Sequence, residues 1–229
     1  MDLGLSIAAS GMVAEQIRED QLANDLANAS TPGYKPAEET QNAFGTLLLT
    51  SQGRTLGSID TQTQITGQTP NLAQGSLQQT GEPLDFAISG TGFFAVRTAA
   101  GVRYTRDGQF TESAQGQLVD ANGNPVLGQN GQPVKVGSDG TVAASALGIF
   151  NVPKPIEEGD NLFSGSASGK ADGSAMSGTL ESSGVDAATT IVNMIASLNT
   201  YQAGQQAIQA INQTLGESAS STGSLGGSA

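Results

Sequence analysis

The segment from Val185 to Leu215 reads VDAATTIVNMIASLNTYQAGQQAIQAINQTL, and its apolar residues recur at alternating spacings of three and four. The eight positions of this repeat hold two polar residues, Gln205 and Asn212. The other six are apolar: Ile191, Met194, Leu198, Tyr201, Ile208 and Leu215. The pattern predicts a long helix with an apolar seam, which forms either a coiled coil or an ordinary amphipathic helix on a globular core.

A second helix is predicted over residues 3–30, which contain neither proline nor an aromatic side chain. Its apolar stripe is interrupted by glutamates, and Gly4 and Gly11 each weaken a helix by about 1 kcal/mol relative to alanine. Such a helix is marginal alone and needs a partner surface. The Ser-Thr-Pro-Gly sequence at 30–33 predicts its end.

The chain between these helices has the short alternating runs and frequent turns that are typical of strands. LDFAI at 84–88 and FFAVR at 93–97 are examples. Three dipeptides are hairpin signals: Asp107-Gly108, Asn122-Gly123 and Asn130-Gly131. Residues 84–150 are therefore predicted to form a small antiparallel β-domain.

The predicted fold class is α+β, with N- and C-terminal helices that pair as a coiled coil and a central antiparallel β-rich domain. Residues 1–35 and 180–215 are predicted to form the terminal helical domain, and residues 36–83 are predicted to be an extended connecting segment. Residues 84–163 are predicted to form the β-rich domain, 164–179 a flexible linker and 216–229 a disordered tail.

Composition excludes several function classes. The net charge of −12 disfavours nucleic-acid binding, because few cations are present to neutralise phosphates. The absence of histidine and cysteine excludes Ser-His-Asp and Cys-His catalysis, disulfides and thiolate metal sites. No apolar run approaches about 18 residues, so we expect no membrane insertion. No conventional signal peptide is visible. We also expect no cofactor and no metal.

Two motifs resemble ligand-binding loops, and each has a structural alternative. The Gly90-Thr-Gly92-Phe-Phe-Ala95 stretch matches a dinucleotide fingerprint, but that fingerprint requires a helix where this sequence predicts a strand. The stretch from Asp120 resembles half of a calcium loop, but Pro125 occupies the position that needs glycine. We expect a strand–turn–strand corner and a type I′ hairpin turn at Asn122-Gly123 instead.

The charged residues of the β-region permit two further interpretations. Four carboxylates could supply a glycosidase pair: Asp85, Asp107, Glu112 and Asp120. Scattered carboxylates in an acidic protein, however, usually lie on solvated surface. Three arginines could bind an anion: Arg97, Arg103 and Arg106. Cross-strand pairing of these arginines with Asp85, Asp107 or Glu112 is favoured instead.

Three separate blocks of the chain resemble the bacterial flagellar rod and hook axial proteins. The first is LANDLANASTPGYK at 22–35, and the last is GTLESSGVD at 178–186 followed by VNMI at 192–195 and Tyr201. The central block contains LDFAI, GTGFF at 90–94, YTRDG at 104–108 and GQL at 116–118. The three blocks occur in the family's order and together span most of the chain.

This resemblance implies a structural subunit without enzymatic activity. In that family the terminal helices pair into an inner layer, and subunits stack into a hollow helical tube that transmits torque and forms an export channel. The implied partners are the chain itself, neighbouring rod and hook axial proteins and the flagellar type III export apparatus, and the implied location is the basal-body rod. The length favours one of the longer rod proteins, distal or proximal.

The expected assembly interface combines the two helical signatures: Leu22, Asn24, Leu26, Asn28, Ile191, Met194, Leu198, Tyr201, Ile208 and Leu215. Three alternatives stay open. They are a short hook-type axial protein, a secreted carbohydrate-active or carbohydrate-binding β-domain protein, and a soluble partner that caps or chaperones filament proteins.

Overall fold

The structure of the chain is a computed structural model that describes residues 2–43, 46–51, 54–60 and 63–225. The chain divides into two compact units. The helical unit comprises Met1–Leu26, Glu39–Gln68 and Ala187–Ala229, and the β unit comprises Ala27–Glu38 and Thr69–Asp186.

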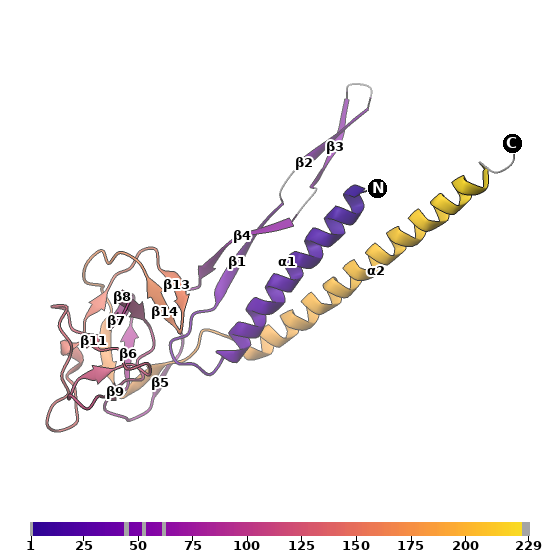
Figure 1. The fold of residues 1–229 in the computed structure, drawn as a ribbon. Helices are drawn as coiled ribbons and strands as arrows, with labels where there is room; N and C mark the ends of the chain where they lie inside the picture. Colours follow the sequence, from indigo (N-terminus) through magenta and orange to yellow (C-terminus); the bar gives the residue numbers. More distant parts are fainter. Residues whose placement is uncertain (1, 44–45, 52–53, 61–62, 226–229) are drawn as a thin grey trace. The chain divides into compact units, whose positions relative to one another are not determined.

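The helical unit contains α1 (Asp2–Ala27) and α2 (Ala187–Leu225), which lie side by side (Figure 1). The chain leaves the helix after Ala27 in a turn that the Thr31 N–H closes on the Asn28 carbonyl at 3.1 Å, just before Pro32. α2 continues to Leu225, ten residues past the predicted end, so the segment predicted as a tail begins as helix. Residues 226–229 of that predicted tail lie outside the described residues.

The segment predicted as an extended connection, 36–83, carries strands β1 to β4 and β5 (Leu77–Gln79). β1 (Ala37–Ala43) pairs with β4 (Thr63–Pro70), and β2 (Thr46–Ser51) pairs antiparallel with β3 (Arg54–Asp60). The positions 44–45, 52–53 and 61–62 of this segment lie outside the described residues.

The core of the β unit is organised around β7 (Phe93–Thr98), which is buried on both faces. Phe94 and Val96 belong to one apolar cluster and Phe93 and Ala95 to another, and each of these side chains is at most 4% exposed. This alternation follows from the two-residue period of a strand. The run FFAV therefore reflects a central strand with apolar packing on each side.

β7 belongs to a six-stranded antiparallel sheet of order β11-β7-β8-β14-β13, in which β12 also pairs with β7. The other strands of this sheet are β8 (Gly101–Thr105), β11 (Val126–Leu127), β12 (Ile149–Phe150), β13 (Ile156–Gly159) and β14 (Leu162–Ser164). A short 3-10 helix lies at Ala144–Ala146, and β9 (Thr111–Glu112) pairs with β10 (Leu118–Val119). The prediction of an antiparallel β-rich centre is confirmed.

Two late strands complete the β unit by pairing with early ones. β15 (Ser174–Ser177) pairs with β6 (Phe86–Ser89), and β16 (Thr179–Glu181) pairs with β5 (Leu77–Gln79). Residues 174–177 of the segment predicted as a flexible linker thus form strand β15. Gly173 is required there by close packing, since a Cβ at this position would lie 2.2 Å from the Thr91 carbonyl oxygen.

The turns differ from the predicted types. Gly123 has φ +81°, but Asn122 is not among the residues of positive φ, so this turn is not type I′. Asp160 and Asn161, between β13 and β14, do have positive φ, at 51° and 58°, as a type I′ hairpin requires. Gly108 is not a hairpin tip, because it lies against the backbone of Phe86, whose N–H donates to its carbonyl oxygen at 2.9 Å.

The Gly90-Thr-Gly92 stretch forms the corner between β6 and β7, which confirms the predicted strand–turn–strand geometry. Of the two helices, over the residues that the structure describes, neither combines the length and apolar content needed to cross a membrane.

Candidate functional site

The face of α2 that meets α1 differs by one residue from the predicted seam at every second position. The Ser197 Oγ lies 2.6 Å from Glu15 Oε2 and 3.3 Å from the Glu15 carbonyl oxygen, both on α1. A Cβ on Gly204 would lie 2.8 Å from the Met12 Cγ. The residues of this face are at least half-buried: Thr190, Met194, Ser197, Tyr201, Gly204, Ile208, Ile211 and Leu215.

The predicted seam residues thus divide into two groups. Met194, Tyr201, Ile208 and Leu215 lie on the face toward α1 and are half-buried. Ile191 and Leu198 do not: they are 45% and 41% exposed and lie beside two further exposed apolar residues, Val192 and Ile195. We call Ile191, Val192, Ile195 and Leu198 the apolar stripe of α2.

The predicted interface residues of the first signature also differ among themselves. Leu22 and Leu26 are half-buried on α1, whereas Asn24 is exposed. Asn28 lies beyond the helix, where its Oδ1 accepts the Thr31 hydroxyl at 3.2 Å and helps to form the turn.

α2 carries no Asp, Glu, Lys or Arg between Ala187 and Gly216. A surface helix usually carries charges on its outward face, whereas interface cores are depleted in them. The described part of this helix instead exposes the apolar stripe among alanine, serine, threonine and amide side chains. This composition is typical of a helix that is covered on more than one side.

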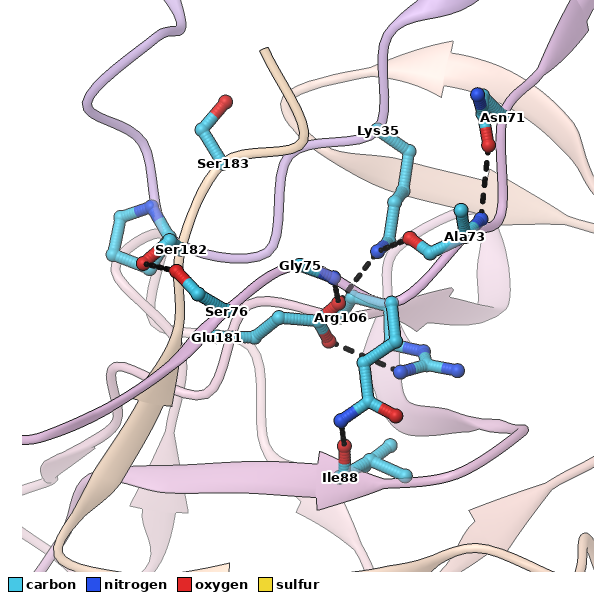
Figure 2. Close-up of polar contacts among 12 residues, drawn as sticks. Lys35, Asn71, Ala73, Gly75, Ser76, Ile88, Arg106, Glu181, Ser182 and Ser183 are labelled. Carbon is cyan, nitrogen blue, oxygen red and sulfur yellow. Dashed lines mark hydrogen bonds and ion pairs between the residues drawn. The ribbon is translucent and has the colours of Figure 1, made fainter. Parts of the chain in front are cut away.

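In the β unit, three charged side chains meet out of contact with solvent (Figure 2). Lys35 and Glu181 have fully buried side chains and lie 2.5 Å apart from Nζ to Oε1, and Arg106 Nη1 donates to Glu181 Oε2 at 3.0 Å. The Gly75 N–H donates to the same carboxylate at 2.8 Å. We call Lys35, Arg106 and Glu181 the ionic junction.

The junction contains two cations and one anion, and backbone carbonyls accept two of the remaining donors, while the buried Arg106 Nε has no hydrogen-bond partner among the described residues. Lys35 Nζ also donates to the Ala73 carbonyl at 2.6 Å, and Arg106 Nη2 donates to the Gly90 carbonyl at 2.9 Å. The Arg106 guanidinium lies 5.4 Å from the centre of the Phe93 ring, a favourable cation–π arrangement. Burial lowers the pKa of Lys35 and the Arg106 charge adds to this, while the hydrogen bond and charge of Glu181 oppose it.

Backbone contacts tie the same three segments together. The Gly33 N–H donates to the Glu181 carbonyl at 2.8 Å, and the Gly184 N–H donates to the Tyr34 carbonyl at 2.9 Å. Gly33 has φ +67°, and a Cβ there would lie 2.2 Å from the Arg106 carbonyl oxygen. Glycine is therefore required both by the conformation and by the close approach.

The arginine partners proposed from the sequence are wrong. Arg103 pairs with Glu158, at 2.6 Å, and Arg97 donates to the Gly131 carbonyl at 2.8 Å. Asp107 instead caps a turn by accepting the Gln109 N–H at 2.9 Å. Burial raises the pKa of Asp107 to about 6, and the nearby charges of Asp120 and Asp85 add to this.

Lys35 and Glu181 were not identified as a pair from the sequence, although both stand inside the quoted signature blocks. The signal that could have found them is position: Lys35, Arg106 and Glu181 are charged residues in the first, central and last blocks of a chain with nine Lys and Arg in total.

Comparison with known proteins matches the same three blocks to flagellar families. Residues 5–35 match the model described as flagella basal body rod protein, and residues 87–144 match the flagellar hook protein FlgE/F/G D1 domain. Residues 176–221 match the flagellar basal body rod FlgEFG protein C-terminal model. Lys35, Arg106 and Glu181 each lie in a different one of these matches.

Similar proteins cover nearly the whole chain. The flagellar basal-body rod protein FlgF of Caulobacter vibrioides is 31% identical over 88% of this chain and 90% of its own length. The flagellar hook-basal body complex protein FlhO of Bacillus subtilis is 28% identical over 97% and 99%. The flagellar basal-body rod protein FlgG of Buchnera aphidicola subsp. Schizaphis graminum is 30% identical over 92% and 96%.

Proposed function

Because the chain belongs to the flagellar basal-body rod protein family and is a structural component of the basal body, we propose that it polymerises through its terminal helices. The polymer is the hollow helical rod, which transmits torque and encloses the export channel. In it, α1 and α2 act as a coiled coil and form the inner layer. The partners are further copies of this chain, neighbouring rod and hook axial proteins, and the type III export apparatus that delivers the subunit.

The exposed surface of α2 between Ala187 and Gly216, a stretch without charged residues, carries this proposal. Ile191, Val192, Ile195 and Leu198 are between 41% and 64% exposed within one helix turn or two of one another. Contiguous apolar surface of this kind is unfavourable in water and marks an interaction site. A second copy that covers the stripe buries it without having to desolvate any charge.

The family is a structural one and is not known for enzymatic activity. The interactions of the carboxylates suit that role. Asp120, one of the four glycosidase candidates, accepts the backbone N–H groups of Asn122 and Asn124 at 3.0 and 2.8 Å, so it stabilises a turn.

The test is a charge placed in the apolar stripe. Ile195→Glu is expected to abolish sedimentation of purified polymer and swimming of cells that carry only this variant, while the monomer keeps its helical circular dichroism. Ile156→Glu is the matched control, because Ile156 is an isoleucine that is 66% exposed on β13, outside the helices. The proposal fails if Ile195→Glu polymerises at the wild-type concentration, or if both variants lose polymerisation equally.

A further inference from the structure

We infer that the ionic junction is a clamp that shortens the chain path between α1 and α2, so that folding of the β unit promotes pairing of the two helices. The inference concerns the isolated subunit and does not depend on polymerisation.

The junction lies near the first entry of the chain into the β unit and near its last exit; between them the chain also leaves after Glu38 and returns at Thr69. This unit begins at Ala27, where α1 ends, and its last residue, Asp186, directly precedes α2. Lys35 is a few residues from the first point and Glu181 is a few residues from the second. Their ion pair therefore holds the segment that follows α1 close to the segment that precedes α2.

Several contacts hold this connection, and most of them are inaccessible to water. The Lys35–Glu181 pair is fully buried, and Arg106 anchors the same carboxylate to the end of β8. The two backbone hydrogen bonds, from Gly33 to Glu181 and from Gly184 to Tyr34, join the same strands of chain without using charge. Opening the junction would expose or orphan two buried cations, which is strongly unfavourable.

The consequence can be estimated from loop closure. Without the clamp, roughly 160 residues separate the end of α1 from the start of α2, and with the clamp the path is about 12 residues. The probability that two chain ends meet falls as about the 3/2 power of the length between them. The clamp therefore raises the effective concentration of one helix at the other by about 50-fold.

An introduced cysteine pair measures that concentration directly. The chain contains no cysteine, and Met12 contacts Gly204 across the helix pair, so Met12→Cys with Gly204→Cys gives a single disulfide between α1 and α2. Its equilibrium with reduced and oxidised glutathione reports the effective concentration of the two thiols in the monomer.

Two insertions separate the clamp from the general stability of the β unit. Twenty Gly/Ser residues after Val185 lie on the short path and are expected to lower the effective concentration about fourfold. The same twenty residues after Asn122, in an exposed turn that the clamp bypasses, are expected to leave it unchanged. If helix pairing depended on the full chain length, each insertion would lower it by only about 1.2-fold, and that result overturns the inference.

A substitution in the junction gives the second test. Glu181→Gln, which leaves Lys35 and Arg106 without a counter-charge, is expected to lower the effective concentration at least about fivefold. Glu158→Gln is the control, because it removes a carboxylate from the partly exposed pair with Arg103 in the same unit. Hydrogen exchange of the Val96 and Tyr104 amides reports whether the β unit stays folded.

An unchanged effective concentration in Glu181→Gln, together with a Val185 insertion that has no effect, refutes the clamp. If the Asn122 insertion unfolds the β unit, the clamp requires that the effective concentration fall by about 50-fold, to the open-chain value. A concentration that stays high in that unfolded unit also refutes it.

Discussion

Gly33 and Arg106 are in backbone contact, with the glycine at φ +67° and no room for a Cβ beside the Arg106 carbonyl oxygen. The contact joins the loop that follows α1 to the end of β8, and strands β1 to β7 lie between these two points along the chain.

Gly33→Ala is expected to lower the free energy of unfolding of the β unit by about 3 kcal/mol or more, because strain at positive φ adds to displacement of the loop. Gly123→Ala is the control. Its φ is +81° but nothing lies within 4 Å of the new Cβ, so only the conformational cost of about 1 kcal/mol applies. Urea denaturation of both variants measures the difference, and equal losses would contradict the importance of the contact.

Leu198→Ala is expected to change monomer stability by less than about 1 kcal/mol, because the side chain is 41% exposed. In the polymer the same truncation removes buried contacts at every subunit, and a loss of about 1.4 kcal/mol raises the critical concentration tenfold. Sedimentation of purified subunits over a concentration series measures this. Gln202→Ala, an exposed polar position on the same helix, is expected to polymerise as the wild type does.

Ile208→Ala tests the other side of α2. Ile208 is half-buried on the face toward α1, so its truncation is expected to weaken helix pairing in the monomer by about 1–3 kcal/mol as well as assembly. Thermal unfolding monitored by circular dichroism separates it from Leu198→Ala. An Ile208→Ala monomer as stable as the wild type would place the pairing face elsewhere.

Gln205→Leu extends the apolar stripe by one heptad beyond Leu198 without entering the face toward α1, since Gly204 occupies that face. We expect stronger self-association with loss of register, seen as irregular aggregates by electron microscopy. Gln205→Ala, which removes the amide without adding a large apolar group, is expected to give regular polymer. Irregular aggregates from both variants would assign the effect to loss of the amide instead.

Asp107 predicts a pH dependence of stability. Its pKa of about 6 in the folded protein lies above the ordinary value of 3.8, so the folded state binds the proton more tightly. The stability from this proton is fully present below about pH 3.8 and is lost as the pH rises through about 6, by about 3 kcal/mol in all. Asp107→Asn keeps the oxygen that accepts the Gln109 N–H and is expected to be the more stable protein at pH 7. Urea denaturation from pH 4 to pH 7 tests this, and parallel profiles for the two proteins would contradict it.

The helices and the β-rich centre could be predicted because their signals are local. The three-and-four spacing after Val185, the breaker at 30–33 and the alternation of Phe93 to Val96 each lie within a few residues of one another. The seam was displaced by one residue at alternate positions for a physical reason. Apolar spacing predicts which faces of a helix avoid water, but not which partner covers each face.

At the helix pair, small residues take the positions that spacing assigned to larger ones. Ser197 and Gly204 permit close approach of the helices, while Leu198 and Ile191 remain outside this contact. The ionic junction is beyond local reasoning altogether. Its members are 75 and 146 residues apart along the chain, and no spacing rule connects positions at that range.

The pairing of β5 with β16 and of β6 with β15 also sets an order in time. The ladder between Leu77 and Glu181 joins residues that are on the order of 100 positions apart, and such non-local pairing is slow to form. A chain that emerges amino end first, from a ribosome or from a narrow conduit, holds β5 and β6 without their partners until its last strands have followed. In such a chain, the β6–β15 and β5–β16 ladders therefore close only after residues 174–181 have emerged.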